Sequence, residues 1–373
     1  MQIRLSSDQT FFRETTAKFL SDVVPVEVIR RLRDDAAGFD PTYWRRGAEL
    51  GWTSLLVDET LGGGSISGDG VLDLAIVAYE FGQTAAPGPL GSANVVASAL
   101  SESGTHKDVL AGLLDGSVLA TSCFSSARSA ASDNSLTIHA DGDELLLNGS
   151  RQPVESAAQA SHLLITASSP DGLTQVLVPT STPGVSISAL QTVDLTRRFS
   201  AVTFEQVRVS KTALVGEVGA AGPAVERQLQ QALVVSNAES VGAIQAAFDM
   251  TVQWAFDRYS FGRPLAAYQA LKHRFADMLS WVEAAHAIAD EAAVAVAENS
   301  PKAASLVSAA KAFIGDYGGE LMHECVQLHG GIGVTFEHDL HLFLRRQTVN
   351  RALLGTPAEH RQRLTDLHEQ RES

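Results

Sequence analysis

The pattern of apolar and polar positions divides the chain into three stretches. Over residues 1–117, apolar residues recur about every 3.6 positions, as in the segment from Val71 to Phe81, and this period predicts amphipathic helices. The glycine-rich segment Leu61–Ser65 and the two prolines of Ala86–Pro89 interrupt the pattern, because neither segment can continue a helix. We therefore expect a helical N-terminal domain over residues 1–117.

Residues 118–220 contain short apolar or alternating runs separated by Asp-Gly, Asn-Gly and Pro-Gly pairs. Such runs are typical of strands, and such pairs are typical of the turns between them. The sequence predicts a central antiparallel β-barrel domain over residues 118–220. The runs behind this prediction are Leu145–Leu147, Leu163–Thr166, Val176–Val178 and Val202–Val209.

Helical periodicity returns after Gly222 and Pro223 and holds to the end of the sequence. The alanine-rich segments Ala284–Ala297 and Ala303–Ala312 favour long helices that pack closely, because alanine has the highest helix propensity and the smallest side chain that still favours a helix. We expect a C-terminal four-helix bundle over residues 221–373. The predicted fold class is α+β: an N-terminal helical domain, a central antiparallel β-barrel domain and a C-terminal four-helix bundle.

Composition and charge narrow the classes of function. Of 373 residues, 45% are hydrophobic and 19% charged, which is enough apolar material for large buried cores. A formal net charge of −15 argues against nucleic acid as a partner. Two cysteines, Cys123 and Cys325, cannot build a disulfide framework, and no run of eighteen apolar residues could span a membrane. We expect a cytoplasmic protein that does not bind a membrane.

Several common site signatures are absent from the sequence. It contains no GxSxG elbow, no GxxxxGK[ST] phosphate loop and no complete GxGxxG after a predicted strand. Histidines gather near the C-terminus, but no HExxH-type spacing holds them together, so we predict no metal site. These histidines are His323, His329, His338 and His341.

Two stretches of the C-terminal region cannot be explained by a packing pattern. In the first, a helix that carries Arg258 stops at Gly262 and Pro264, so that Arg258, Ser260 and Gln269 gather at a corner between two helices. Their donors suit a pyrophosphate group. The second stretch, Gln327–Glu337, has three glycines in four residues, which lets a ligand approach the backbone amides.

Together the two stretches resemble the signatures of the acyl-CoA dehydrogenase flavoprotein family. The order of helices, β-barrel and helices matches that family over the whole chain. Shorter segments also match in place. These are Gly51-Trp52, Gly62–Gly64, Leu147–Gly149, Ala160–Leu164 and Leu214–Gly216.

The resemblance implies FAD held between subunits of a dimer or tetramer, and α,β-desaturation of an acyl-CoA thioester. In the family, a carboxylate removes the α-proton and the β-hydrogen leaves as hydride to flavin N5. An electron-transfer flavoprotein is the expected acceptor. The family's flavin ring is held by segments that correspond to about Ala120 to Ser129 and Gln152 to Ser156. The residues that match the FAD-binding positions are Arg258, Ser260, Phe261, Gln269, Gln327, Gly330 and Gly331.

The chain departs from the family where the chemistry occurs. The family's commonest base corresponds to Leu354, and its other base position corresponds to Ala232, beside Leu233. Pro153 and Glu155 replace the aromatic and the threonine that face the flavin, and the usual Thr-Glu-Pro run is absent. This pattern resembles the base-lacking subunit of the α2β2 complexes of some actinobacterial sterol and branched-acyl pathways. Such a chain would complete its partner's FAD site.

Other readings stay open at the level of sequence. Glu239 lies two helical turns after Ala232 and is a candidate catalytic base; the alternative is that it caps a helix or pairs with an arginine. Glu155 is a second, weaker candidate. The chain could also be a catalytic homo-oligomer, a flavin-free scaffold or binding protein, or a flavin oxidase or monooxygenase on the same fold. The sequence does not identify the acyl group.

Overall fold

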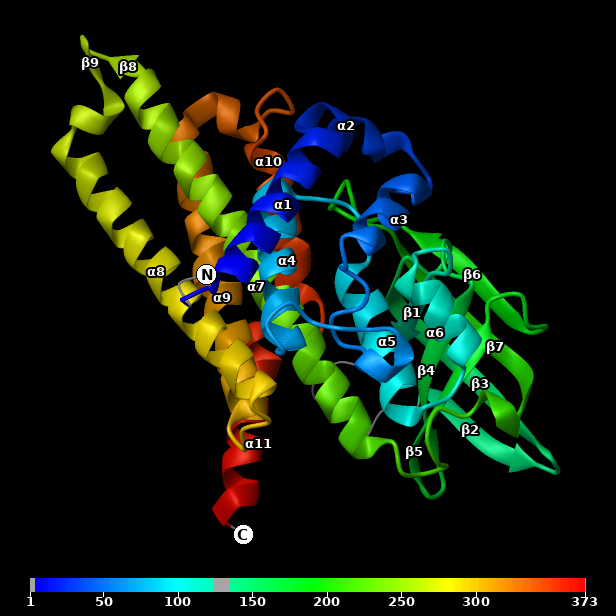
Figure 1. Cartoon of the computed structure of the whole chain (residues 1–373). Helices are drawn as coiled ribbons and strands as arrows, with labels where there is room; N and C mark the ends of the chain where they lie inside the picture. Colours follow the sequence, from blue (N-terminus) through cyan, green and yellow to red (C-terminus); the bar gives the residue numbers. More distant parts are fainter. Residues whose placement is uncertain (1–3, 124–134, 373) are drawn as a thin grey trace.

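The computed structural model describes residues 4–123 and 135–372, and it confirms the predicted fold class. A helical region, a curled β-sheet and a second helical region follow one another along the chain (Figure 1). The segment Ser122–Ser132, which the sequence suggests is a loop with its strand, falls mostly outside the described residues. Of the flavin-facing segment Ala120 to Ser129, only residues 120–123 are described, as the first strand.

The N-terminal region consists of helices packed around aromatic side chains. Trp52 is fully buried and its ring lies edge-on against Phe81, with 5.0 Å between the ring centroids. The predicted helix from Val71 to Phe81 is confirmed as part of α4. The helices are α1 (Ser7–Val23), α2 (Val26–Arg31), α3 (Pro41–Glu49), α4 (Gly70–Thr84), α5 (Leu90–Ser103) and α6 (Lys107–Leu114), with short 3-10 turns η1 (Leu32–Asp34) and η2 (Glu59–Leu61).

The middle region is a seven-stranded curled sheet in which β1, β4, β2, β3, β7 and β6 are neighbours in that order and β5 pairs with β4. All four predicted runs are strands. Most pairs are antiparallel, as predicted, but β4 pairs in parallel with β1 and with β2. Parallel neighbours need a crossover, and the β2–β3 hairpin provides it between β1 and β4. The strands are β1 (Ala120–Cys123), β2 (Leu136–Asp141), β3 (Glu144–Glu155), β4 (His162–Ser169), β5 (Gly172–Pro179), β6 (Val185–Leu190) and β7 (Phe199–Ser210).

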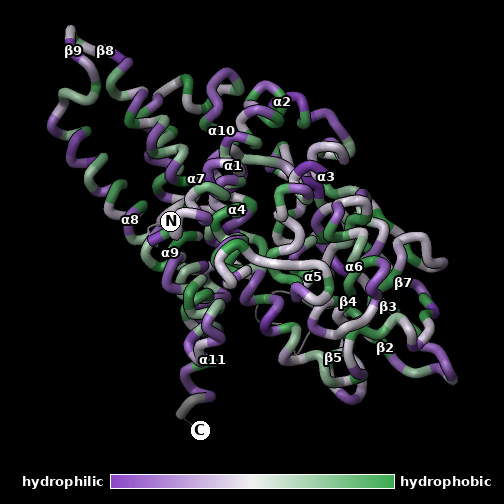
Figure 2. Tube along the Cα trace, viewed as in Figure 1, coloured by the Kyte–Doolittle hydropathy of each residue, from purple (hydrophilic) through white to green (hydrophobic). Residues whose placement is uncertain are grey.

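The C-terminal region packs α7, α8, α9 and α10 together as the predicted four-helix bundle, and α11, which follows α10, packs against α9. Pro223 lies in the first turn of α7, where a missing N–H costs nothing. Figure 2 shows α4 and α5 as largely apolar and α11 as largely polar. The bounds are η3 (Lys211–Ala213), α7 (Gly222–Asp257), η4 (Leu265–Ala267), α8 (Gln269–Ala297), α9 (Ala303–His329), η5 (Gly330–Val334), α10 (Leu340–Ala352) and α11 (Pro357–Glu372).

Helix α7 joins the two helical regions because it packs against α4 at a pair of glycines. A Cβ atom on Gly82 would lie 2.0 Å from the carbonyl oxygen of Glu239, and one on Gly242 would lie 2.1 Å from that of Tyr79. Only glycine permits helices to approach so closely. This contact fixes the middle of α7, including Glu239, against the N-terminal region.

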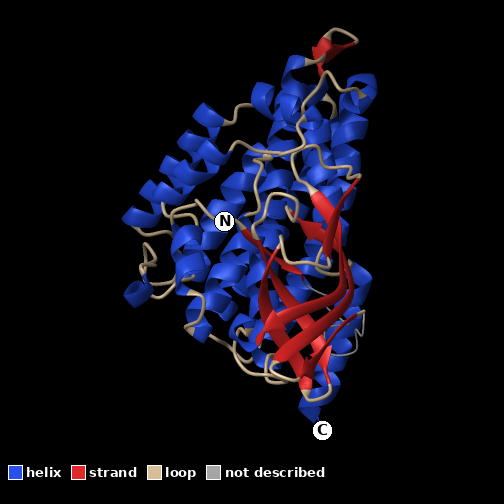
Figure 3. Ribbon diagram, turned by 90° about the vertical axis from the view of Figure 1, so that its right-hand side faces the viewer, coloured by secondary structure: helices blue, strands red, loops and turns tan. Residues whose placement is uncertain are grey.

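The sheet lies beside one end of the bundle, and a small hairpin of β8 (Tyr259–Ser260) and β9 (Arg263–Pro264) projects from the other end (Figures 1 and 3). The two views agree that the hairpin is remote from the sheet. Among the described residues, no helix is both long enough and apolar enough to cross a membrane.

Candidate functional site

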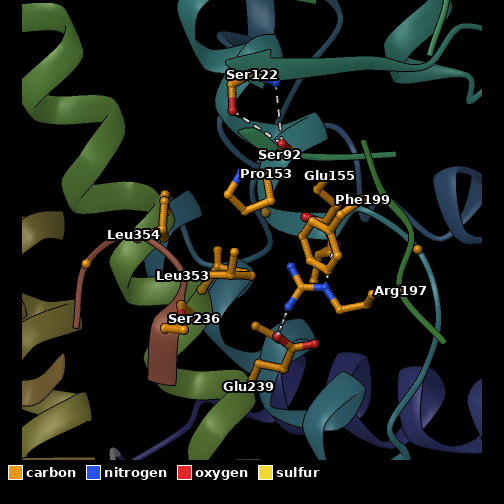
Figure 4. A pocket seen from close by; sticks show the side chains of 18 of the residues that line it. Ser92, Ser122, Pro153, Glu155, Arg197, Phe199, Ser236, Glu239, Leu353 and Leu354 are labelled. Atoms are coloured by element: carbon orange, nitrogen blue, oxygen red, sulfur yellow. Dashed lines mark hydrogen bonds and ion pairs between the residues drawn. The ribbon is translucent and has the colours of Figure 1, made fainter. Parts of the chain in front are cut away.

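A cavity opens where the sheet, α4, α5, α7 and the connection from α10 to α11 meet (Figure 4). It contains about 210 Å³ of space that water can enter. One part of its lining is apolar and another carries hydroxyl and charged groups, as expected for a small-molecule site. The lining residues used below are Ser92, Ser122, Pro153, Glu155, Arg197, Phe199, Ala232, Val235, Ser236, Glu239, Leu353, Leu354 and Glu359.

Leu354 and Ala232, which the sequence matches to the two usual base positions, both line this cavity. Leu354 has a φ of 60°, in the left-handed region that leucine seldom adopts, and it follows Leu353, the cap of α10. Leu233 is fully buried and is not part of the lining. Neither aliphatic side chain at the cavity can accept a proton.

Arg346 is the centre of a buried cluster of ion pairs next to the cavity. Its side chain is fully buried, and it donates to Asp194 at 2.6 Å and to Glu239 at 2.5 Å. It also donates to the hydroxyl of Thr196 and to the carbonyl of Ala86. Burial raises the pKa of Asp194, but the charges of Arg346 and other donors outweigh burial and hold that pKa below its ordinary value.

Arg197 extends the same cluster into the cavity wall. Its Nε donates to Glu155 at 2.5 Å, and its Nη1 donates to Asn350 at 2.7 Å and to Glu239 at 3.3 Å. Burial alone would lower the pKa of Arg197, but the carboxylates of Glu155 and Glu239 outweigh it and raise the pKa above its ordinary value. We call Arg197, Arg346, Asp194, Glu155, Glu239 and Asn350 the ion-pair cluster.

Glu239 reaches the cavity, as its position on α7 predicts, but both of its oxygens are occupied. Oε1 accepts from Arg346, and Oε2 accepts from Arg197 and from Asn350 at 3.0 Å. A carboxylate that accepts three such hydrogen bonds has little capacity left for a substrate proton. The contacts match the pairing with an arginine that the sequence leaves open as the alternative to catalysis.

The residues predicted to hold a cofactor lie at the other end of the bundle. They are Arg258 at the end of α7, Ser260 and Phe261 in the β8–β9 hairpin, Gln269 at the start of α8, Gln327 near the end of α9, and Gly330 and Gly331 in the η5 turn. No described residue accepts from the guanidinium of Arg258, which is exposed, and 96% of Phe261 is exposed. A Cβ on Gly330 or Gly331 would meet nothing within 4 Å, so the backbone there is open to a ligand. The structure therefore separates these residues from Glu239 and from this chain's own cavity.

Aromatic stacking connects the end of α7 to the glycine turn. Trp254 stacks on His329 with ring centroids 5.3 Å apart, and His338 lies edge-on to His329 at 4.4 Å. His329 is buried and bonds through Nδ1 to the carbonyl of Cys325 at 2.8 Å. Within residues 4–123 and 135–372, no group of three or more His, Cys, Asp or Glu side chains could hold a metal ion.

Sequence reasoning misses Arg346, Asn350, Arg197 and Ser236. The only local signal is the polar run Asp194–Arg198, which lies between two predicted strands and holds two arginines. Its partners come from α7 and α10, far along the chain, so no local spacing reveals them.

Comparison with known proteins identifies the family to which the chain is similar. The N-terminal domain of acyl-CoA dehydrogenases matches residues 6–114, and the C-terminal domain matches residues 222–366. The acyl-CoA dehydrogenase IpdE2 of Mycolicibacterium smegmatis is 30% identical over 96% of this chain and 98% of its own length.

Solved structures agree with the sequence comparison. A variant of the Tcur3481-Tcur3483 steroid acyl-CoA dehydrogenase superposes with a TM-score of 0.88 at 28% identity, over 98% of this chain and 99% of that one. The ChsE4-ChsE5 complex of Mycobacterium tuberculosis has the same fold, with a TM-score of 0.88 at 23% identity over 98% of each chain. Proteins of this family bind FAD. The domain matches, the relative that spans the whole chain and the fold together place this protein in the acyl-CoA dehydrogenase family.

Proposed function

We propose that this chain is a subunit of an FAD-dependent acyl-CoA dehydrogenase that completes the FAD site of a neighbouring subunit and lacks a catalytic base of its own. The observation that carries the proposal is the pair of aliphatic side chains, Leu354 and Ala232, that line the cavity at both usual base positions. Acyl-CoA thioesters are the proposed substrates of the complex, and an electron-transfer flavoprotein is the proposed acceptor.

The β8–β9 hairpin and the η5 turn fit the adenosine and pyrophosphate half of FAD. Arg258 offers a guanidinium that no described residue uses, and the open backbone at Gly330 and Gly331 lets an anionic group approach the amides. Ser260, Phe261, Gln269 and Gln327 complete the proposed set. Because these groups are remote from this chain's cavity, they would serve a neighbour. When bound there, FAD supplies the hydride acceptor for desaturation.

The cavity of this chain fits a flavin ring poorly. Pro153 and Glu155 stand where the family has an aromatic residue and a threonine, and the carboxylate of Glu155 is tied to Arg197 at 2.5 Å. At these two positions the chain offers neither an aromatic ring nor a hydroxyl donor to a flavin. We therefore assign the flavin to a partner chain of the same fold. The two solved relatives named as paired chains support a heteromer of this kind.

Replacing Arg258 with alanine is expected to weaken FAD binding by the complex about 10- to 100-fold, the range for one hydrogen bond to a charged group. The fold should be unaffected, because Arg258 is exposed and its side chain holds no other element. Flavin absorbance after gel filtration, followed by titration of the stripped protein with FAD, would measure the change. Arg263→Ala is the matched control, since Arg263 is on the same hairpin and stacks on Tyr268 at 4.0 Å. Unchanged FAD binding in Arg258→Ala would remove Arg258 from the cofactor site.

Replacing Glu239 with glutamine separates the two roles open to this residue. We expect turnover by the complex to stay within about threefold, while the melting temperature falls because Arg346 and Arg197 lose a shared negative charge. A general base would instead lose about 10²- to 10⁴-fold in turnover with FAD still bound. Glu155→Gln, at another carboxylate of the cluster that lines the cavity, is the control. A loss of that size confined to Glu239→Gln would establish Glu239 as the base.

A further inference from the structure

Two polar groups in the cavity have no hydrogen-bond partner among the described residues. They are the hydroxyl of Ser236 on α7 and the Nη2 of Arg197, in the segment before β7. Both residues line the cavity. The Ser236 hydroxyl is buried, and an unmet buried donor costs free energy. Arg197 Nη2 is not counted among the buried unmet atoms, but it is a donor that no described residue uses. Together the two groups point to a ligand that accepts from them.

Ser236 is nine-tenths buried, with 9% of its surface exposed. A serine inside a helix commonly bonds to the carbonyl four residues earlier, which here belongs to Ala232, but Ser236 does not make that bond. Its neighbours in the lining, Val235 and Leu353, are apolar. The Ser236 hydroxyl is therefore a polar group among apolar neighbours in the lining of the cavity.

Arg197 approaches from the sheet side. Its Nε and Nη1 are occupied by Glu155, Glu239 and Asn350, and 12% of its side chain remains exposed. Figure 4 shows its guanidinium pointing across the cavity toward Leu353. The ion pairs hold the group rigidly, so a hydrogen bond from Nη2 to a ligand would cost little side-chain entropy.

The charged groups around Arg197 determine whether its free Nη2 favours a neutral oxygen or a carboxylate of a ligand. Burial, reinforced by the charge of Arg197, lowers the pKa of the nearby Lys311 to about 7, so this lysine is partly neutral at physiological pH. Lys311 Nζ donates to the backbone carbonyl of Asn350. The charges named below sum to between 0 and −1, so the wall offers a further carboxylate no net attraction. The charged groups counted are Arg197, Arg346 and Lys311 against Asp194, Glu155 and Glu239.

We propose that this cavity binds an acyl-CoA thioester whose acyl group is mostly apolar and carries a neutral oxygen, a ketone or a hydroxyl, with Arg197 Nη2 and Ser236 Oγ as the specificity-determining donors. The proposal rests on the proposed function only in taking acyl-CoA as the ligand class. Binding needs no base and no flavin in this cavity.

The test is calorimetric binding of three thioesters to the complex purified with its cofactor: 5-oxohexanoyl-CoA, hexanoyl-CoA and glutaryl-CoA. The first two differ by one ketone oxygen, and the third carries a carboxylate. We expect 5-oxohexanoyl-CoA to bind about tenfold more tightly than hexanoyl-CoA, the usual effect of one or two hydrogen bonds. Ser236→Ala should lower that preference about threefold or more and leave hexanoyl-CoA binding unchanged. Ser240→Ala, on the same helix but outside the lining, should change neither.

The outcomes separate the inference from the proposed function. Equal binding of the ketone and hexanoyl thioesters, or an unchanged preference in Ser236→Ala, would overturn the inference alone. If glutaryl-CoA bound more tightly than 5-oxohexanoyl-CoA, the inference that the acyl group carries a neutral oxygen would be wrong. Binding of none of the three would contradict the proposed function itself. Arg197→Lys keeps the charge but loses the fork of donors, so it should lower the ketone preference as Ser236→Ala does.

Discussion

Replacing Arg346 with alanine is expected to lower the free energy of unfolding by about 3–5 kcal/mol, the cost of breaking a buried ion pair on one side. The guanidinium is fully buried between Asp194 and Glu239, at 2.6 Å and 2.5 Å. Its removal takes away the arginine that pairs with Asp194, leaves Glu239 paired with Arg197, and also removes the donor to the Ala86 carbonyl. Urea or thermal unfolding at fixed protein concentration would measure the loss.

Arg345 supplies the matched control for this prediction. It is the neighbour of Arg346 on α10, donates to the carbonyl of Val193 at 3.0 Å and lies over Phe336 at 5.1 Å, but it holds no ion pair among the described residues. Arg345→Ala should cost less than about 1 kcal/mol. A loss below about 1 kcal/mol in Arg346→Ala would show that the ion-pair cluster does not stabilise the fold. If Arg346→Ala does not fold, Arg346→Met keeps much of the packing volume and tests the loss of the charge and its hydrogen bonds.

Expressed alone, this chain is expected to desaturate acyl-CoA thioesters at least about 10²-fold more slowly than the complex with its partner, the lower bound for a missing general base. Leu354 and Ala232 cannot accept a proton. Of the three carboxylates in the described lining, Glu155 and Glu239 are held by arginines, and Glu359 accepts from the backbone N–H and the hydroxyl of Thr356. The hairpin with Arg258, in contrast, keeps its donors free.

The assay is turnover of a panel of acyl-CoA thioesters with an artificial electron acceptor. It would be run first on the lone chain and then on the chain co-expressed with candidate partners of the same fold from the same operon. Robust turnover by a pure homo-oligomer would contradict the proposed heteromer. Glu239 and Glu155 would then again be candidate bases. Oxygen consumption without an added acceptor would instead indicate an oxidase.

The fold could be predicted from the sequence because its signals are local. The helical period from Val71 to Phe81 and the alternation from Val202 to Val209 each fall inside one element, α4 and β7. The parallel pairing of β1 with β4 could not be predicted, since it depends on which strands meet after the chain has crossed over.

The site residues also fall into those that the sequence reveals and those that it does not. The hairpin beside Arg258 and the turn at Gly330 are contiguous motifs, which is why the sequence reveals them. Gly330 caps α9, but α7 ends at Asp257, before the predicted stop at Gly262 and Pro264, because the chain enters the β8–β9 hairpin there. The cluster around Arg346 joins residues 107 and 152 positions apart, so its partners become neighbours only in the folded chain. Ser236 is also invisible in sequence, because a serine on a helix carries no sign that its hydroxyl lacks a partner.

The amount of FAD per chain tests the central claim most directly. It is measured by combining flavin absorbance with the mass of the active species from light scattering during gel filtration. If this chain completes a partner's site and holds no flavin in its own cavity, the active complex will contain one FAD for every two chains, and the lone chain will be nearly colourless. One FAD for each copy of this chain in an active homo-oligomer would contradict the account.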